Sequence, residues 1–169
     1  MMKEKTTPKV IYFFIFIIAI AADRLSKIWA ERCLAGGKDM VLIPGIIDFH
    51  YLENRGAAFG MLQGKFVFFY LFTAVVLMAI LYFIIKCPKD NHYICINAVL
   101  SVIAAGAVGN FIDRVSRQYV VDFIYFKPIN FPVFNVADIF VTVGCILFAL
   151  LVIFRYEDSD FDFLGFRHK

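Results

Sequence analysis

Long apolar runs separated by shorter polar segments are the main pattern of the chain. A helix needs about 20 predominantly apolar residues to cross a bilayer, and in lipid its backbone polar groups must be satisfied within the segment. Four runs reach this length and predict transmembrane helices at about residues 10–28, 66–85, 93–112 and 133–154. Because the number of spans is even, both ends of the chain are predicted to lie on one side of the membrane.

The first run also has the features of a secretory signal peptide. A basic stretch precedes it, and Ala19-Ile20-Ala21 forms a small-residue motif of the kind found at cleavage sites. Three further apolar runs follow it, so we interpret the first run as a retained helix.

Two of the connecting segments have the patterns of β-strands. Residues 46–60 (IIDFHYLENRGAAFG) begin with alternating apolar and polar side chains, the period of a half-buried strand. They then break at Gly56, because glycine permits turn conformations that other residues resist. Residues 118–126 (QYVVDFIYF) are β-branched and aromatic. We therefore predict a small β-cradle outside the membrane, built from about residues 38–62 and 117–127.

Composition supports the same class of protein. The chain is 62% hydrophobic, includes 21 Phe and is only 18% charged, and its mean hydropathy is +0.77. A soluble domain averages about 45–50% apolar and about 25% charged residues. We predict an all-α integral membrane protein in which four transmembrane helices and the extracytoplasmic cradle form one domain, residues 1–154. Residues 155–169, charged and aromatic without a period, are predicted to be a mobile cytoplasmic tail.

Basic residues in the short flanks indicate the orientation. Lysine and arginine are denser around the chain ends and the turn at 87–92 than in the two longer loops, at about 30–65 and 113–132. Cytoplasmic flanks carry an excess of these residues, so both termini are predicted to be cytoplasmic and the two longer loops to face outward. The residues on which this prediction depends are Lys3, Lys5, Lys9, Lys86, Lys89, Arg155, Arg167 and Lys169.

Polar side chains recur at helical spacing near the outer ends of three predicted helices. Residues three or four apart share one helix face, so each set is expected to face one neighbour. Because a helix rises about 1.5 Å per residue, Asp138 should lie just below the start of its helix. The sets are Asp23 with Lys27, Asn110 with Asp113 and Arg114, and Asn135 with Asp138.

Each of these sets also has a purely structural interpretation. The alternatives are helix-anchoring ion pairs for Asp23–Lys27 and Asp113–Arg114, a turn at Asn54–Gly56, and a helix N-cap with a first-turn acid for Asn135 and Asp138. Asp122 differs, because it lies inside an apolar strip. An ionisable residue at membrane depth is a functional candidate by default.

Paired carboxylates are the chemistry that the residue types favour. The three histidines are far apart and form no HExxH motif, and the four cysteines have no metal-binding spacing. No serine has a GxSxG context or a nearby histidine. Asp122 and Asp138 form the natural pair, since a short return from the outer strip to the start of the last helix could bring them together. Two carboxylates held close share one proton. One then activates water and the other donates a proton, without a metal or another cofactor.

Five short motifs resemble the signature blocks of the lipoprotein signal peptidase family, also called signal peptidase II. They occur in the family's order and spacing and cover nearly the whole chain apart from its ends. The chain departs from the usual family residues at Arg24 and Ile139, which bear on substrate preference. The motifs are DRLSK (23–27), NRGAAFG (54–60), GNFIDR (109–114), VVDF (120–123) and FNVADI (134–139).

The resemblance implies a multi-pass aspartic endopeptidase of the bacterial cytoplasmic (inner) membrane, with its active site near the outer face. Its partners would be membrane lipids and diacylglyceryl-modified prolipoproteins, which it would cut before the lipidated Cys. We expect a monomer with no nucleic-acid partner. Asp122 and Asp138 match the catalytic pair, and Asp113 matches a structural position. Residues that match positions lining or supporting the site are Asp23, Asn54, Gly56, Asn110, Arg114, Asn135 and Ala137.

Two other functions stay open at this level. A small proton-coupled transporter also uses membrane carboxylates, but it predicts ionisable residues throughout the membrane thickness. The second and third apolar runs are nearly free of charge inside. A noncatalytic scaffold with four spans would tolerate replacement of the two aspartates by asparagine.

Overall fold

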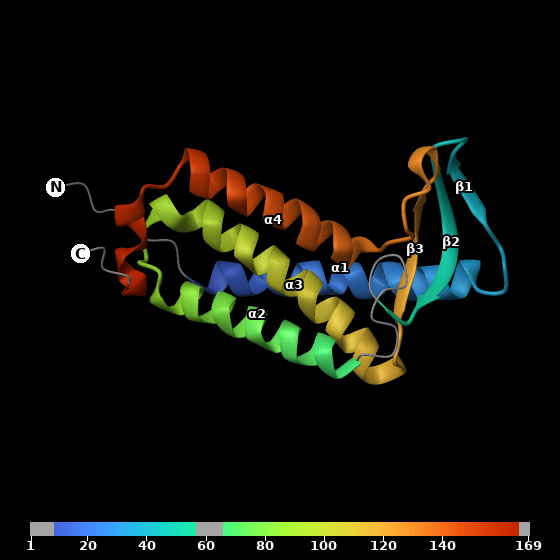
Figure 1. Ribbon diagram of the computed structural model, residues 1–169, viewed down its shortest axis with the longest axis horizontal. Coiled ribbons are helices and arrows are strands. Elements are labelled where there is room, and N and C mark those ends of the chain that lie inside the picture. Colours follow the sequence, from blue (N-terminus) through green and yellow to red (C-terminus); the bar gives the residue numbers. More distant parts are fainter. Residues whose placement is uncertain (1–8, 57–65, 166–169) are drawn as a thin grey trace.

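In the part of the chain that the computed structural model describes, four α-helices carry a small sheet across one end (Figure 1). The structure describes residues 9–56 and 66–165. Residues 57–62 of the predicted cradle, 57–60 of the NRGAAFG motif, and the basic residues Lys3, Lys5, Arg167 and Lys169 lie outside the described residues. The helices are α1 (Val10–Leu34), α2 (Phe66–Lys86), α3 (Ile94–Arg117) and α4 (Val136–Phe154).

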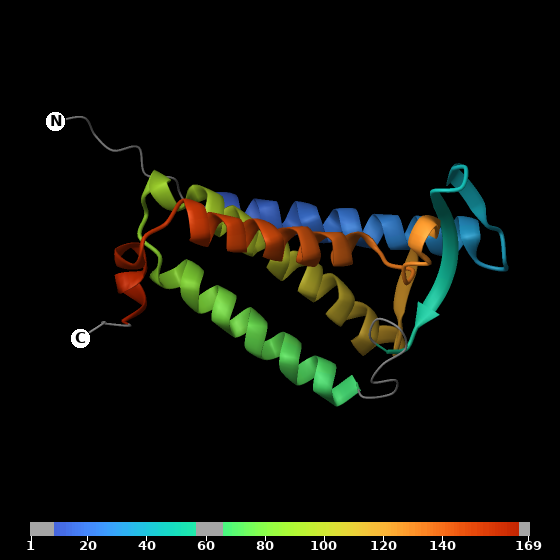
Figure 2. The same ribbon diagram turned by 45° about the horizontal axis from the view of Figure 1, so that its top comes forward.

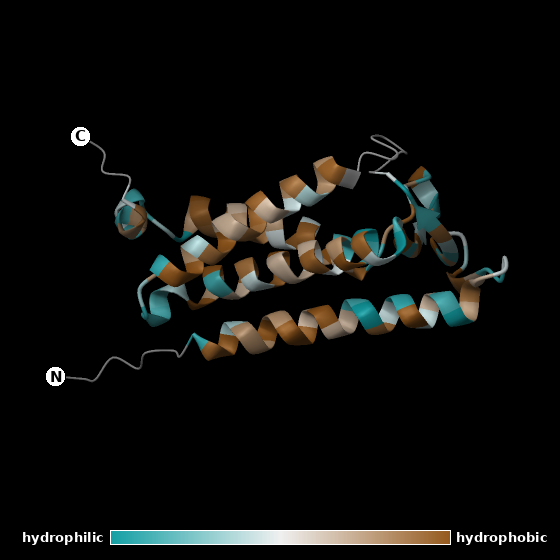
Figure 3. Cartoon of the chain, turned by 90° about the horizontal axis from the view of Figure 1, so that it is seen from below, coloured by the Kyte–Doolittle hydropathy of each residue, from teal (hydrophilic) through white to brown (hydrophobic). Residues whose placement is uncertain are grey.

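Three helices in the described part of the chain are long and apolar enough to cross a membrane: Val67–Lys86, Asn91–Arg117 and Val136–Phe154. They indicate an integral membrane protein. Figure 3 shows hydrophobic residues along much of the helices, and hydrophilic residues at helix ends and along the half of α1 that leads to the sheet. The uncharged part of α1 ends at Ala22, because Asp23, Arg24 and Lys27 follow. The predicted span at residues 10–28 therefore stays a prediction.

Two helices extend past the predicted spans. The helix α1 continues to Leu34, and α3 continues to Arg117. The added turns of α1 pack against the sheet, with Ala30 and Leu34 in one buried cluster with Val121 and Phe123. Hydropathy detects the helix residues that face lipid, but it misses helix turns that are buried by other parts of the protein. The apolar runs therefore end before the helices do.

The cradle is a three-stranded antiparallel sheet in the order β1-β2-β3. The strands are β1 (Met40–Ile43), β2 (Ile47–Asn54) and β3 (Val120–Phe126). Both segments predicted to form strands do so, and the remaining strand, β1, pairs with β2 at the edge. The register sets Leu52 opposite Asp122 and Asn54 opposite Val120. It therefore brings the last residue of β2 beside the acidic residue of β3.

Aromatic packing fixes the sheet against α1. The Trp29 ring meets the Phe49 ring edge-to-face, with centroids 5.2 Å apart, and lies 6.1 Å from the Phe123 ring. Such aromatic pairs stabilise by about 0.5–1.5 kcal/mol beyond their buried area. The contact holds β3 across the ends of α1, α3 and α4. Figure 2 shows the sheet at the end of the bundle opposite the first and last described residues.

The other end of the bundle is closed by residues from both chain ends. The Nζ of Lys9 donates to the backbone oxygens of Ile84 and Ile85, each at 2.7 Å. The Tyr156 hydroxyl donates to the backbone oxygen of His92 at 2.9 Å. The beginning of α1 therefore lies beside the end of α2, and the end of α4 lies beside the beginning of α3.

The prediction of a mobile tail is wrong for residues 155–165. Asp158–Leu164 form a 3-10 helix, η4, and the Tyr93 hydroxyl donates to the backbone oxygen of Asp160 at 2.9 Å. The Phe163 ring packs edge-to-face on the Phe83 ring with centroids 5.3 Å apart. The aromatic residues of this segment have no helical period, so composition and period predicted no fixed structure. They are held in place because they cover the ends of α2 and α3.

Candidate active site

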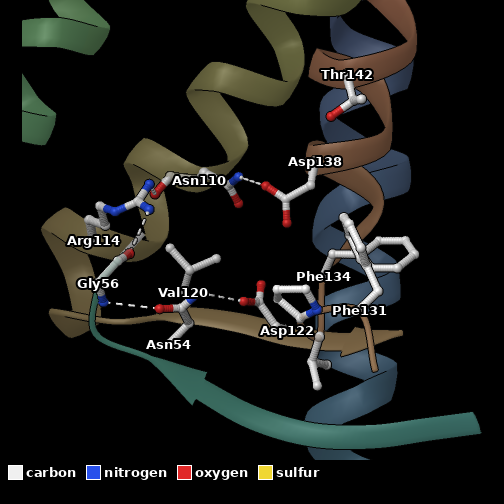
Figure 4. A pocket seen from close by; sticks show the side chains of 12 residues that line it. Asn54, Gly56, Asn110, Arg114, Val120, Asp122, Phe131, Phe134, Asp138 and Thr142 are labelled. Carbon is white, nitrogen blue, oxygen red and sulfur yellow. Dashed lines mark hydrogen bonds between the residues drawn. The ribbon is translucent and has the colours of Figure 1, made fainter. Parts of the chain in front are cut away.

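A cavity of about 230 Å³ opens where the sheet meets α3 and α4. Asp122 of β3 and Asp138 of α4 both point into it, as Figure 4 shows. Two segments separated along the chain thus bring carboxylates to one space. The polar residues that line the cavity are Asn54, Asn110, Arg114, Asp122, Asp138 and Thr142.

The alternation of side chains along β3 points Asp122 into the cavity. Successive side chains of a strand face opposite sides of the sheet. Val121 and Phe123 pack with α1 in a buried cluster, so the side chain between them faces the other way. Asp122 is only 2% exposed. Burial of this carboxylate requires hydrogen-bond donors, because an unpartnered charge away from water is costly.

Two asparagine side chains donate to the Asp122 carboxylate. Asn54 Nδ2 donates to Oδ2 at 2.8 Å, and Asn135 Nδ2 donates to Oδ1 at 2.6 Å. The orientation of the Asn54 amide is itself fixed, because the Gly56 backbone N–H donates to its Oδ1 at 2.9 Å. The Asn54–Gly56 turn therefore holds an amide group that contacts the Asp122 carboxylate.

Asp138 is held at the third position of α4. The Asn135 Oδ1 accepts from the Asp138 backbone N–H at 3.0 Å, and the Asp138 Oδ2 accepts from the Asn135 backbone N–H at 3.0 Å. This reciprocal pair is a capping box, so the predicted N-cap is confirmed. The remaining oxygen, Oδ1, accepts from Asn110 Nδ2 at 2.8 Å. Asn135 thus orients Asp138 through the capping box, and its amide nitrogen is free to donate to Asp122 as well.

The pKa of Asp122 is raised to about 7. The largest cause is burial, and the negative charge of Asp138 acts in the same direction. Hydrogen bonds from Asn54 and Asn135 partly offset this shift by favouring the ionised form. The Asp122 carboxyl group can therefore hold a proton near neutral pH.

Asp113 and Arg114 do not pair with each other, contrary to one structural alternative. Arg114 donates to the backbone oxygen of Gly56 at 3.4 Å, and its guanidinium carbon lies 4.5 Å from the centre of the Phe69 ring. Asp113 instead pairs with Lys27, at 3.0 Å, and with Arg24. Adjacent residues on a helix point in different directions, so each of the two finds partners on another segment.

Asp23 and Ala137 lie behind the cavity. The predicted ion pair between Asp23 and Lys27 is confirmed, with 3.0 Å between Oδ2 and Nζ. Asp23 Oδ1 accepts from the Ala137 backbone N–H at 3.1 Å, which ties α1 to the first turn of α4. Ala137 is fully buried. The structure thus places six candidates around the cavity, Asn54, Gly56, Asn110, Arg114, Asp122 and Asp138, and three behind them, Asp23, Asn135 and Ala137.

Sequence reasoning missed several residues of the cavity wall. Thr142 lines the cavity one helical turn after Asp138, and its spacing of four residues was the signal that could have found it. Phe131 and Phe134 form an apolar wall, but nothing in their spacing distinguishes them from other aromatic residues. Within residues 9–56 and 66–165, no cluster of three or more histidine, cysteine, aspartate or glutamate side chains is arranged to hold a metal ion.

The chain is similar to known membrane peptidases over most of its length. The family model for Signal peptidase (SPase) II matches residues 15–154. A lipoprotein signal peptidase of Clostridium novyi is 41% identical over 142 residues, which cover 82% of this chain and 95% of the relative. One of Enterococcus faecalis is 40% identical over 144 residues, covering 85% and 88%. A solved structure described as a bacterial membrane enzyme is 32% identical, has a TM-score of 0.80 and covers 98% of this chain and 97% of its own.

Proposed function

The chain belongs to the signal peptidase II family, and from this premise we propose that it is an aspartic endopeptidase that cuts diacylglyceryl-modified prolipoproteins before the lipidated Cys. Membership of this family implies a protease, so it does not favour the transporter or the scaffold. The observation that carries the aspartic assignment is the shared cavity of Asp122 and Asp138, each with its own hydrogen-bond donors.

In the proposed reaction, a water molecule between the two carboxyl groups attacks the scissile carbonyl carbon. Ionised Asp138 takes a proton from this water, and protonated Asp122 gives its proton to the carbonyl oxygen, which forms a tetrahedral diol. When the diol collapses, Asp138 passes its proton to the leaving nitrogen and Asp122 takes one back from a hydroxyl group. The raised pKa of Asp122, about 7, supports this division of roles.

The three asparagines hold the reacting groups without titrating themselves. Asn54 and Asn135 fix both oxygens of Asp122, and Asn110 fixes one oxygen of Asp138. Such fixed donors need not reorganise as charge moves during the reaction. We assign these residues to positioning and not to proton transfer.

Apolar surfaces beside the cavity support a lipid-modified substrate. A groove of about 370 Å³ between α3 and α4 is lined by apolar residues and includes Ile139, the residue after Asp138. A second apolar hollow of about 300 Å³ shares Phe131 and Phe134 with the cavity wall. Acyl chains bound in the first of these would lie next to the carboxylates, with the peptide crossing the cavity.

We place α1 as the fourth span, with both termini cytoplasmic and the cavity near the outer face of the bacterial inner membrane. The charges of α1 do not exclude it, because Asp23 and Lys27 are at most 1% exposed and pair inside the bundle, and Arg24, with 24% of its side chain exposed, pairs with Asp113. Buried, paired charges are the form in which ionisable residues are tolerated within membranes. The first and last described residues lie at one end, away from the sheet (Figure 1).

Cleavage of a defined precursor by the purified protein tests the function. A synthetic precursor with a diacylglyceryl cysteine is incubated with the protein in detergent, beside the same peptide without the lipid, and products are identified by mass spectrometry. We expect cleavage before the cysteine of the lipidated peptide alone, and inhibition by a pepsin-type inhibitor. Folded protein that leaves the lipidated peptide intact, or cuts it elsewhere, contradicts the proposal.

A further inference from the structure

We propose that Lys27 is a positioning residue that holds both aspartates in place at once. It acts through the amide of Asn110 and through two buried carboxylates, those of Asp23 and Asp113. This inference rests on the proposed function of Asp122 and Asp138, and it assigns to Lys27 a role beyond anchoring a helix end.

The Lys27 ammonium group is buried and surrounded by three oxygen atoms. The side chain is 1% exposed. Its Nζ lies 3.0 Å from Asp23 Oδ2, 3.0 Å from Asp113 Oδ2 and 2.9 Å from Asn110 Oδ1. An ammonium group has three protons to donate, and three acceptors surround it. Two of these acceptors are carboxylates that pair with the positive charge. The third is the amide oxygen of Asn110, a residue that lines the cavity.

The contact with Lys27 fixes which end of the Asn110 amide faces Asp138. Asn110 Oδ1 accepts from both Lys27 and Asn135 Nδ2, the latter at 3.2 Å. Reversing the amide would set its NH₂ group against these two donors and its oxygen against the Asp138 carboxylate. The ammonium therefore keeps Asn110 Nδ2 directed at Asp138 Oδ1, 2.8 Å away.

The same ammonium connects the backbone supports of the two aspartates. Asp23 Oδ1 accepts from the backbone N–H of Ala137, the residue before Asp138. Asp113 Oδ2 accepts from the backbone N–H of Val121, the residue before Asp122, at 3.4 Å. One cation thus joins the carboxylate that holds the first turn of α4 to the carboxylate that holds β3.

Replacement of Lys27 by methionine tests the inference, because methionine keeps much of the apolar stem and lacks the donors. We expect Lys27→Met to lower kcat by about 10- to 100-fold, the range for loss of a hydrogen bond involving a charged group, with KM within about twofold. Lys9→Met is the matched control: Lys9 Nζ also holds two oxygen atoms, but at the far end of the bundle. It should keep wild-type kcat. Wild-type kcat in Lys27→Met overturns the inference.

A double-mutant cycle separates action through Asn110 from a general loss of structure. If Lys27 acts through this amide, Lys27→Met should lower kcat much less in an Asn110→Ala background than in the wild type. Residues that act as a unit show such non-additivity. Losses that simply multiply would overturn the assignment to Asn110.

A charge-balanced variant covers the case in which Lys27→Met does not fold. Lys27→Met combined with Asp23→Asn removes one cation and one anion, and asparagine keeps an Oδ1 acceptor for the Ala137 N–H. We expect it to recover thermal stability in detergent but not kcat. Recovery of kcat would show that Lys27 serves charge balance only. If Asp122→Asn and Asp138→Asn remain active, the proposed function itself fails; if they are inactive and Lys27→Met is normal, only this inference fails.

Discussion

Asn135 Nδ2 donates to Asp122 Oδ1 at 2.6 Å, while the Oδ1 atom of the same side chain caps α4. One buried asparagine therefore connects the start of a helix to a carboxylate on a strand. The sequence pattern predicted the cap, and it contained no sign of the second contact.

Two replacements of Asn135 separate these tasks. Serine can accept from the backbone N–H of Asp138 and preserve the cap, but it has no NH₂ group to donate to Asp122. Both variants lose the donor to Asp122, so we expect Asn135→Ala to be less stable than Asn135→Ser by the contribution of the cap, about 0.5–2 kcal/mol. Both should lose at least about tenfold in kcat. Thermal unfolding in detergent and cleavage assays measure the two effects, and full activity of the serine variant contradicts the assigned role of the amide nitrogen.

The pH dependence of cleavage should report the protonation of Asp122. Because this carboxyl group is proposed to act in its protonated form and its pKa in the substrate-free protein is about 7, kcat/KM should fall as pH rises through that value. Asn54 donates to the ionised form and lowers the pKa, so Asn54→Leu should raise it and move the decline to higher pH.

The control for this pH profile is Asp39→Asn, because Asp39 is an exposed carboxylate, 56% accessible, in the part of the chain before β1. It should leave the decline where it is. A decline that stays fixed or moves to lower pH in Asn54→Leu contradicts the assignment of Asp122 as the proton donor.

Close approach of α3 and α4 depends on glycine. A Cβ atom added at Gly106 would lie 2.5 Å from the backbone oxygen of Ala137, whereas one added at Gly144 would lie 2.5 Å from Cγ1 of Ile103, a side-chain atom that can shift without moving the backbone. Gly106→Ala should therefore cost about 1–3 kcal/mol and displace the turn that holds Asp138, and Gly144→Ala should cost less. Unfolding midpoints and kcat of the two variants provide the comparison; equal effects would contradict this account of the contact.

Topology can be tested with reporters placed in loops. A reporter fused near Lys38 should be active outside the cytoplasmic membrane, and one fused near Lys89 should be active inside. The reason is the higher density of basic residues around the chain ends and the turn at 87–92. The reverse result would place the cavity on the wrong side for secreted substrates.

The sequence predicted the elements better than the contacts between them. Apolar runs located the four helices, and the β-branched strip around Asp122 located a strand, because both signals are local in the chain. The two carboxylates were paired by elimination among residue types. Their convergence on one cavity depends on how the sheet packs against Trp29, which no local pattern encodes.

Two contacts of the site could not be read from spacing along the chain. The structural alternative for Asp113 was an ion pair with its neighbour Arg114, whereas its ion-pair partners lie on α1. Asn135 caps α4 as its position indicated, but its side-chain nitrogen also reaches across to β3. Long-range contacts decide where a polar side chain is satisfied, and a single sequence shows only spacing along the chain.

Replacement of each aspartate by asparagine tests the central claim most directly, because asparagine keeps the size of the side chain and removes its ability to exchange a proton. Cleavage of the lipidated precursor is measured with purified Asp122→Asn and Asp138→Asn proteins, and Asp39→Asn serves as the control. We predict that both variants accumulate in the membrane and lose at least about 100-fold in kcat, while the control cleaves normally. Wild-type cleavage by either variant would contradict catalysis by this pair of carboxylates.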